Sequence, residues 1–356
     1  MPPPSQTDAA QSFYERATAA QAAGQYAEGV RLLWQGVQHG EMNAMTQLGG
    51  QLISGRGAPP DPAKGAQLML EAANRGGAYA CAVVSTIAAS GLFGPRDWER
   101  ALDYLQRSAE LGYETAQSQL KLLARQVGVV KADPSSWSLL RRRVDLNAWR
   151  ACPSGRLLTD DGAIRVVDKF ATADVCDWII ARAQGRFAPA TVFGPSGQGA
   201  VKEGDRTNSF AGFDLLNIDL AVLLVLDRLA AACGGSPGAM EPPHVLHYAV
   251  GQQFASHYDF LDPEVAGHVG DLARHGQRTQ TLLIYLNEGF EGGETDFPLL
   301  GVRFKGGKGD LLIFANANSD GAPDRRMLHA GLPPTAGEKW VLSQWVRNRA
   351  PAGRES

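Results

Sequence analysis

The chain has 356 residues, of which 44% are hydrophobic and 20% charged, and its formal net charge is −3. This length predicts two domains, and the composition is that of an ordinary soluble globular protein. The near-neutral charge argues against a nucleic-acid partner and against binding to an anionic membrane surface. Enzymes and protein-binding modules are the classes that remain.

Targeting and membrane signals are not visible in the sequence. Residues 1–5 lack a basic start followed by an apolar run. The most apolar stretch, residues 220–233, is too short to cross a bilayer and contains Asp227 and Arg228. The four cysteines lie far apart without a CxxC pair, so buried reduced thiols are expected in place of a zinc site or disulfides. These features predict a cytoplasmic protein without a membrane partner.

The N-terminal third contains an internal repeat. At an offset of 36 residues, four columns of similar residues align without gaps. Each unit is typical of an amphipathic helix that ends at a glycine, followed by an Ala-rich helix. Such units bury their apolar faces by stacking, which predicts a short α-helical solenoid over residues 10–125. The columns are Gly40, Gly76 and Gly112; Leu33, Met69 and Leu105; Ala44, Ala80 and Ala116; and Leu48, Val84 and Leu120.

Two segments of the second unit carry a family resemblance. Asp-Pro-Ala-Lys-Gly-Ala at residues 61–66 and Glu-Ala-Ala-Asn-Arg-Gly at residues 71–76 resemble a Sel1-type repeat, a relative of the tetratricopeptide repeat. The resemblance implies a protein-interaction scaffold, so the repeats would recruit a protein partner. A helical cap that only supports the second domain is the alternative, and the sequence leaves both interpretations open.

A linker and a second domain follow the repeat. Residues 126–160 show no repeat and are punctuated by Pro, Ser, Gly and Asp clusters, which predicts a linker. Residues 137–149 are expected to form one bridging helix within it. The second domain is expected over residues 161–349. It begins with a strand at residues 164–167 and a helix whose N-terminus Thr172 can cap.

After a second helix, expected at residues 218–232, the chain becomes rich in short strands. Helices followed by many short strands fit an α+β domain built round a double-stranded β-helix, or jelly roll. The predicted fold class is therefore multidomain, with an all-α helical repeat followed by a jelly roll. Apolar-aromatic runs bounded by Gly, Pro or Asn predict strands at residues 244–250, 280–286, 309–314 and 339–346.

His257, Asp259 and His329 are candidate metal ligands. Residues i and i+2 of a strand project from the same face, so His257 and Asp259 can bind one cation. His329 lies just before the last predicted strand and can supply a third ligand. Two histidines and one carboxylate that leave open positions are typical of non-haem iron(II) oxygenases, whereas a structural zinc site closes all four positions. The sequence therefore predicts a catalytic iron centre.

Lys339 is a candidate for binding a cosubstrate. It lies ten residues after His329, at the start of the last predicted strand. A cosubstrate that chelates iron through a 2-oxo acid also carries a distal carboxylate, which needs a cation. A lysine on a neighbouring inner strand is a suitable point charge for it.

Six motifs occur in one order along residues 163–347. They include Gly292-Gly293-Glu294-Thr295 and Leu328-His329-Ala330-Gly331. In content and order they resemble the prolyl 4-hydroxylase family of Fe(II)- and 2-oxoglutarate-dependent dioxygenases. The motifs lie at residues 245–260, 276–287, 292–298, 308–310, 328–331 and 337–347.

This resemblance implies a set of reactants and residue roles. Iron(II), 2-oxoglutarate and dioxygen would react, with ascorbate as a further cofactor. The implied activity is a procollagen-proline 4-dioxygenase type of hydroxylation (EC 1.14.11.-) of a protein or peptide, with release of succinate and carbon dioxide. His257, Asp259 and His329 would bind iron. Lys339, assisted by Tyr248 and Thr295, would bind 2-oxoglutarate. Groups lining a peptide groove would be Arg206, Glu241, Arg278 and Trp345.

The sequence departs from the family pattern at three positions. Phe254 stands where members commonly have Tyr, Asn208 replaces a frequent Ser, and Arg347 stands where some members carry His. None of the three is an expected iron ligand, but all three are expected to lie close to the bound cosubstrate or substrate. The choice of proline as the target is therefore the weaker part of the resemblance. The Gly-rich loop at residues 191–208 resembles a flap that closes over substrate.

Three alternatives remain beside a peptidyl hydroxylase. The repeats could act as a protein-binding scaffold with a vestigial oxygenase domain, although the intact ligands and Lys339 argue against that. A nucleic-acid demethylase of the same superfamily would usually hold the cosubstrate with arginine in place of Lys339, and the near-neutral charge also disfavours it. A small molecule or free amino acid remains open as the substrate.

Overall fold

The computed structural model describes residues 11–125, 137–189, 206–318 and 321–349. The chain divides into two compact units. One comprises Met1–Asp145 with Leu215–Leu223, and the other comprises Leu146–Asp214 with Leu224–Ser356. The division into residues 10–125, 126–160 and 161–349 stays a prediction. Among the described residues, no helix is both long and apolar enough to span a bilayer.

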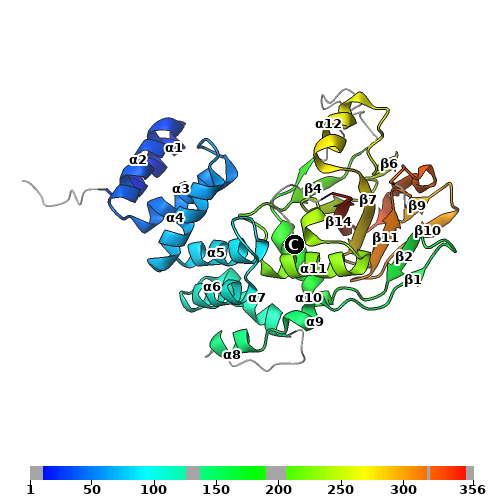
Figure 1. The fold of residues 1–356 in the computed structure, drawn as a ribbon, viewed down its shortest axis with the longest axis horizontal. Coiled ribbons are helices and arrows are strands. Elements are labelled where there is room, and N and C mark those ends of the chain that lie inside the picture. The colour runs from blue at the N-terminus through cyan, green and yellow to red at the C-terminus, as the bar shows by residue number, and fades with distance from the viewer. Residues whose placement is uncertain (1–10, 126–136, 190–205, 319–320, 350–356) are drawn as a thin grey trace, which may run out of the picture. The chain divides into compact units, whose positions relative to one another are not determined.

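Helices α1 to α7 form the repeat of the N-terminal unit, coloured blue to cyan in Figure 1. Helices α2, α4 and α6 begin at residues 26, 62 and 98, and helices α3, α5 and α7 begin at residues 42, 78 and 114. Both series have the 36-residue spacing of the sequence columns, so the predicted helical repeat is confirmed. The helices are α1 (Phe13–Ala22), α2 (Tyr26–Gln38), α3 (Met42–Ser54), α4 (Pro62–Asn74), α5 (Ala78–Ser90), α6 (Trp98–Glu110) and α7 (Glu114–Arg125).

The aligned columns have distinct structural roles in the repeat. The glycines of the first column all adopt positive φ, between 77° and 95°, in the short turns between paired helices, where other residues would be strained. The apolar columns are buried in the core of the stack. Small residues also let two helices approach, because a Cβ added at Gly65 of α4 would lie 2.7 Å from the carbonyl oxygen of Gly49 in α3.

The segment predicted as one bridging helix contains two. Helix α8 (Trp137–Arg142) ends before a turn, and α9 (Leu146–Arg150) begins after it. Asp145 directly precedes α9, and aspartate is favoured at helix N-termini because its carboxylate can accept from free backbone N–H groups. The single helix over residues 137–149 was therefore wrong.

The second unit contains two antiparallel sheets that form the predicted jelly roll. The large sheet has the strand order β1-β2-β11-β7-β14-β5-β4-β3, and the small sheet has the order β10-β9-β12-β6. The large sheet is formed by β1 (Arg156–Leu157), β2 (Ile164–Val167), β11 (Leu311–Ala315), β7 (Arg278–Tyr285), β14 (Lys339–Arg347), β5 (His244–Tyr248), β4 (Ser209–Gly212) and β3 (Ala188–Pro189). The small sheet is formed by β10 (Val302–Phe304), β9 (Thr295–Phe297), β12 (His329–Gly331) and β6 (Phe254–His257).

Besides α9, this unit contains α10, most of α11, α12 (Figure 1) and a short third sheet. The predicted cap is present, because the Thr172 hydroxyl accepts from the Val175 N–H at the start of α10. The elements are α10 (Ala173–Ala183), α11 (Leu220–Cys233), α12 (Ala266–His275) and the strand pair β8 (Glu291–Gly292) and β13 (Pro334–Ala336), with 3-10 turns at Pro237–Ala239 and Arg325–Met327.

An aromatic core fills the space between the two sheets. Tyr285 and Phe314 of the large sheet and Phe297 of the small sheet are fully buried in one apolar cluster. The Phe297 and Phe314 rings meet edge to face with centroids 5.0 Å apart. This packing holds the two sheets together and fixes the strands that carry the candidate site.

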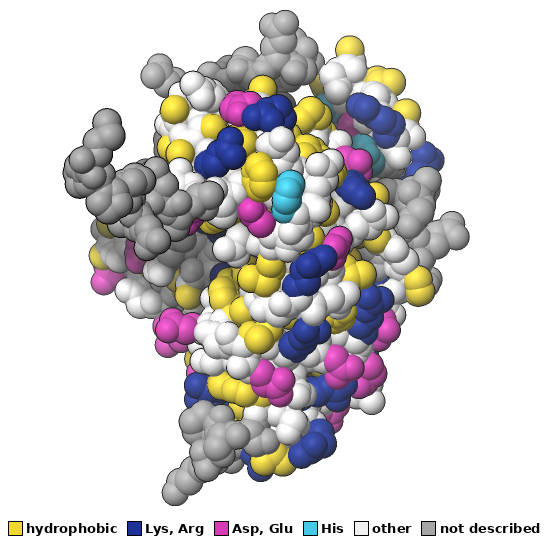
Figure 2. Space-filling view, turned by 90° about the vertical axis from the view of Figure 1, so that its left-hand side faces the viewer, with side chains coloured by type: hydrophobic (Ala, Val, Ile, Leu, Met, Phe, Trp, Pro, Cys, Tyr) yellow, Lys and Arg dark blue, Asp and Glu magenta, His cyan; other side chains and the backbone are white. Residues whose placement is uncertain are grey.

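The cysteine expectation is met only in part. All four cysteines are free, and Cys81 and Cys176 are buried, but Cys152 and Cys233 are partly exposed. Burial raises the pKa of the Cys176 thiol to about 12. On the face shown in Figure 2, basic and acidic side chains are interspersed, in keeping with the near-neutral net charge.

Candidate active site

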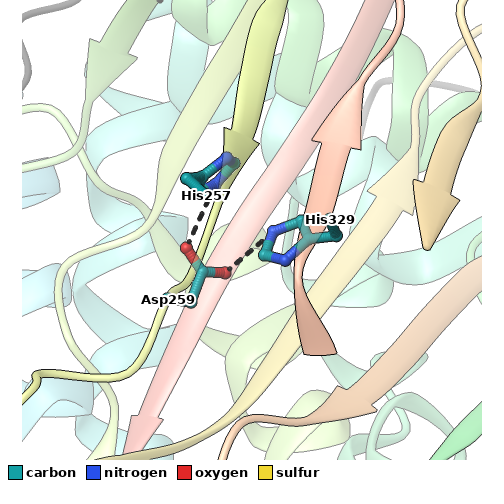
Figure 3. A group of neighbouring side chains, drawn as sticks. All are labelled: His257, Asp259 and His329. Atoms are coloured by element: carbon teal, nitrogen blue, oxygen red, sulfur yellow. Dashed lines mark ion pairs between the residues drawn. The ribbon is translucent and has the colours of Figure 1, made fainter. Parts of the chain in front are cut away.

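The three predicted metal ligands converge at one place in the jelly roll (Figure 3). His257 is the last residue of β6 and His329 the first of β12, and the register of these paired strands sets the two histidines opposite each other. Asp259 follows two residues after His257. Antiparallel pairing therefore joins ligands that lie far apart in the sequence.

The donor atoms of the three side chains lie within 4.8 Å of one another. Asp259 Oδ1 is 3.4 Å from His257 Nε2, and Asp259 Oδ2 is 3.5 Å from His329 Nε2. Asp259 and His329 are 6% and 4% exposed, while His257 is only partly buried. Two imidazole nitrogens and one carboxylate oxygen form a donor set that suits iron(II) and leaves further positions open on one side.

Backbone carbonyls orient both imidazole rings. His257 Nδ1 lies 2.8 Å from the Ala255 carbonyl oxygen, and His329 Nδ1 lies 3.0 Å from the Met327 carbonyl oxygen. A carbonyl only accepts, so Nδ1 carries a proton in each ring. The nitrogen that faces Asp259 in each ring is therefore Nε2, the one left to bind a metal.

The charges of the cluster favour metal-binding protonation states. Burial lowers the pKa of His329 to about 4, so this ring is neutral at pH 7. Burial by itself raises the pKa of Asp259, but His329, His257 and the Thr281 hydroxyl outweigh that effect and keep the pKa below its ordinary value. Neutral imidazoles beside a carboxylate are the forms that bind a cation.

Lys339 is a buried cation on the inner side of the large sheet. It is 2% exposed, and its ammonium lies 5.1 Å from the Tyr248 ring centroid and 5.3 Å from that of Tyr285. Burial lowers the pKa of Lys339 to about 7, and the charge of Glu294 partly opposes this. Lys339 forms no ion pair with a described residue, so its surroundings suit the carboxylate of a bound acid.

The two residues expected to assist Lys339 lie beside it. Tyr248 pairs with Lys339 in the register of β5 and β14, and its hydroxyl approaches Gly331 of β12. Thr295 of β9 pairs with Gly331 of β12, and the Thr295 hydroxyl lies 2.8 Å from the Tyr285 hydroxyl. Gly331 belongs to the strand that begins with His329, so Tyr248 and Thr295 lie near the cluster of metal-ligand candidates.

Three of the four expected groove residues form one cluster. Arg278 binds Glu241 through two parallel hydrogen bonds of 2.7 and 2.9 Å. The same guanidinium lies 3.7 Å from the centroid of the Trp345 ring. Arg347 also donates to Glu241 at 2.5 Å and to Asp271 of α12 at 2.8 Å. The arginine that departs from the family pattern thus ties α12 to the cluster.

Arg206, the fourth expected groove residue, lies near the metal-ligand candidate His257. Its guanidinium is 4.3 Å from the Phe254 ring centroid, and the Phe254 ring stacks on His257 with centroids 3.5 Å apart. Its Nε donates to Asn208 Oδ1 at 3.2 Å. Burial lowers the pKa of Arg206. Residues 191–205 of the predicted flap lie outside the described residues.

Two site residues were missed by the sequence analysis. Thr281 and Asn316 connect to Asp259 through buried hydrogen bonds, although neither carried a predicted role. Thr281 stands in an apolar run, and a polar residue at an inward-facing strand position is a signal that could have identified it. Asn316 carries no such local signal, because it lies just after β11 and outside any strand.

Comparisons with known proteins agree with this site. The family model of the 2OG-Fe(II) oxygenase superfamily matches residues 243–347, which contain the metal cluster and Lys339. The jelly roll and its two-histidine, one-carboxylate cluster therefore define a 2OG-Fe(II) oxygenase.

Two curated relatives show to which family within this superfamily the chain belongs. The chain is 32% identical over 197 residues to probable prolyl 4-hydroxylase 9 of Arabidopsis thaliana, covering 51% of this chain and 67% of that one. It is 30% identical over 203 residues to prolyl 4-hydroxylase 1 of the same organism, covering 52% and 69%. The chain belongs to the prolyl 4-hydroxylase family. A solved Sel1 repeat protein from Oxalobacter formigenes is also similar, at 18% identity and a TM-score of 0.31, covering 39% of this chain and 60% of that one.

Proposed function

We propose that this chain is an Fe(II)- and 2-oxoglutarate-dependent hydroxylase that acts on a prolyl residue of a protein or peptide and releases succinate and carbon dioxide. The observation that carries the proposal is the convergence of His257, Asp259 and His329 beside the buried, anion-seeking Lys339. The family membership supports the choice of a prolyl target.

The chain's own residues have separate tasks in this proposal. His257, Asp259 and His329 hold iron(II) through two neutral imidazoles and one carboxylate. Lys339 binds the distal carboxylate of 2-oxoglutarate, with Tyr248 and Thr295 completing that corner. When bound with dioxygen, iron and 2-oxoglutarate supply the oxidising power to hydroxylate an unactivated C–H bond, with ascorbate as the accessory reductant. The protein supplies orientation and shelter from water.

The groove residues position the target. The Trp345 ring, with Arg278 stacked on it and Glu241 bound to that arginine, offers a flat aromatic face with fixed polar groups beside it. Such a face suits the ring of a proline and the carbonyl groups of its peptide. Arg206 on Phe254 provides a second polar edge next to the metal ligands.

We propose that the helical repeats recruit the protein that carries the target residue. A hollow of about 420 Å³ in the N-terminal unit is lined by residues of α1, α3 and α5. Its lining is mostly apolar in exposed area and also carries hydroxyls, amides such as that of Asn43, and the guanidinium of Arg56. A mixed lining of this kind suits a peptide, which presents apolar side chains together with backbone donors and acceptors.

The test is succinate release by the purified full chain, measured with and without iron(II), 2-oxoglutarate and a proline-containing peptide. We expect release to require the first two and to rise with the peptide, which gains the mass of one oxygen atom. Succinate release stimulated only by free amino acids or small metabolites would show that the substrate is a small molecule and not a protein or peptide. No release in any metal-loaded sample would favour a scaffold with a vestigial oxygenase domain and end the proposal.

A further inference from the structure

Asp259 accepts a hydrogen bond from one buried polar side chain of the large sheet and is linked through it to a second. Thr281 of β7 donates from Oγ1 to Asp259 Oδ2 at 2.7 Å, and Asn316, just after β11, donates from Nδ2 to Thr281 Oγ1 at 2.8 Å. Thr281 and Asn316 are each only 1% exposed. Burial at this level makes each hydrogen bond costly to lose.

Asn316 faces Thr281 with its amide nitrogen, while its Oδ1 is buried without a hydrogen-bond partner among the described residues. In this orientation of the amide the hydrogen bonds run in one direction. An amide nitrogen can only donate, so Asn316 occupies an acceptor site of the Thr281 hydroxyl. That hydroxyl has a single proton, which must then point to Asp259. With the amide turned over, its oxygen would instead accept the proton and leave Asp259 without it.

The backbone holds both members of the chain in place. Asn316 N–H donates to the Thr279 carbonyl at 2.8 Å, and the Asn316 carbonyl accepts from Asp324 N–H at 3.0 Å. Thr281 lies in a central strand, paired with Phe314 on one side and Trp345 on the other. These backbone contacts fix the positions from which the two side chains reach toward Asp259.

From this geometry we propose that Thr281 and Asn316 form a directional relay that commits one oxygen of Asp259 to a hydrogen bond, so that the carboxylate offers the metal one oxygen and not two. This inference rests on the proposed function and names Thr281 and Asn316 as positioning residues. Because one oxygen lies next to each histidine, the unrestrained carboxylate could chelate with both. Chelation would fill a position that cosubstrate or dioxygen needs.

The experiment measures Co(II) binding to the full chain by calorimetry and by the visible absorption of the bound ion, which depends on coordination number. Thr281→Val keeps the side-chain shape and removes the hydroxyl, and Asn316→Asp replaces the donor by an acceptor at almost the same shape. We expect both variants to bind Co(II) about 10- to 100-fold more weakly, because Asp259 is no longer held in its binding orientation. We expect the visible spectrum to shift toward a higher coordination number, because the second oxygen of Asp259 becomes free to bind.

Two further variants serve as controls. Thr281→Ser retains the hydroxyl and should restore the wild-type affinity and spectrum. Thr279→Val makes the same change on the same strand, where the hydroxyl donates to the Val346 carbonyl at 3.3 Å, and should leave both readouts unchanged. Folding of each variant is checked by its thermal unfolding.

The outcomes separate this inference from the proposed function. Wild-type Co(II) affinity and spectrum in Thr281→Val would overturn the relay while leaving the metal centre standing. Equal losses in Thr281→Val and Thr279→Val would also overturn it, because they would mark a general effect on the strand. A wild-type chain that binds no Co(II) would overturn both. If Thr281→Val fails to fold, the spectrum of Asn316→Asp decides in the same way.

Discussion

The two regions of this chain reach their structures by different routes. In the helical unit, α3 packs on α4 and α5 on α6, so each helix finds its partner next to it in the sequence. In the jelly roll, β14 lies between β5 and β7, and β12 lies between β6 and β9. The repeat is a sum of local contacts, whereas the site exists only once distant strands have paired. A single substitution among the metal-ligand candidates should therefore abolish turnover, whereas a single substitution in the repeat should only lower the stability of the helical unit.

The largest effect is expected at the metal cluster. His257→Ala and Asp259→Ala should each abolish 2-oxoglutarate turnover, because two remaining ligands hold iron(II) poorly. Since His257 is partly exposed and lies at the end of β6, its removal should leave thermal unfolding nearly unchanged. Turnover is measured as succinate, with His39→Ala in the repeat as the control. Wild-type turnover in either ligand variant would contradict the proposed centre.

The next effect concerns Lys339. Lys339→Ala should raise the 2-oxoglutarate concentration needed for half-maximal turnover by about 10- to 100-fold, the usual value of a hydrogen bond to a charged group. The pKa of about 7 also sets a pH dependence in the wild type. The ammonium is present below that pKa and lost above it, so affinity for 2-oxoglutarate should fall as pH rises through 7. Titration calorimetry across pH 6–8 checks this, and an equally steep dependence in Lys339→Ala would assign it to another group.

A smaller effect is expected at the groove cluster. Glu241→Gln keeps the shape but removes the charge that Arg278 and Arg347 share. Arg278 then loses its carboxylate partner, and Arg347 keeps only the carboxylate of Asp271. The KM for a peptide should rise about 10-fold, while peptide-independent decay of 2-oxoglutarate should not change. Asp168→Asn, which breaks the exposed pair with Arg156, should alter neither. An equal rise in the KM for the peptide in both variants would contradict a role of Glu241 in peptide binding.

The smallest effects test the repeat. In Gly65→Ala the new Cβ would lie 2.7 Å from the Gly49 carbonyl oxygen and 2.8 Å from Ile53 Cγ1, which should destabilise the helical unit by about 1–3 kcal/mol. Gly50→Ala meets nothing closer than 3.6 Å and should stabilise α3 by about 0.5–1 kcal/mol. Thermal unfolding of the full chain measures both. Peptide-independent succinate release should be unchanged in both variants. A loss of this activity would contradict the view that the repeat and the site in the jelly roll respond separately to substitution.

Much of the repeat could be predicted because its information is local. The offset that aligned Gly40, Gly76 and Gly112 is the offset at which paired helices begin in the structure. The helix over residues 137–149 failed for a local reason as well, because Asp145 can begin a new helix. In the jelly roll, the predicted strand at residues 164–167 has the same bounds as β2. The strand expected to carry both His257 and Asp259 ends at His257, and β12 was not predicted as a strand.

The sequence by itself determined which residue types the site would use. His257, Asp259, His329 and Lys339 stand in motifs whose chemistry can be recognised without coordinates. Tertiary structure alone decided how they meet, through the pairing of β6 with β12 and of β5 with β14. It also brought Thr281 and Asn316 to Asp259. The physical reason is that a hydrogen bond between strands depends on their register, and register follows from the packing of the whole sheet.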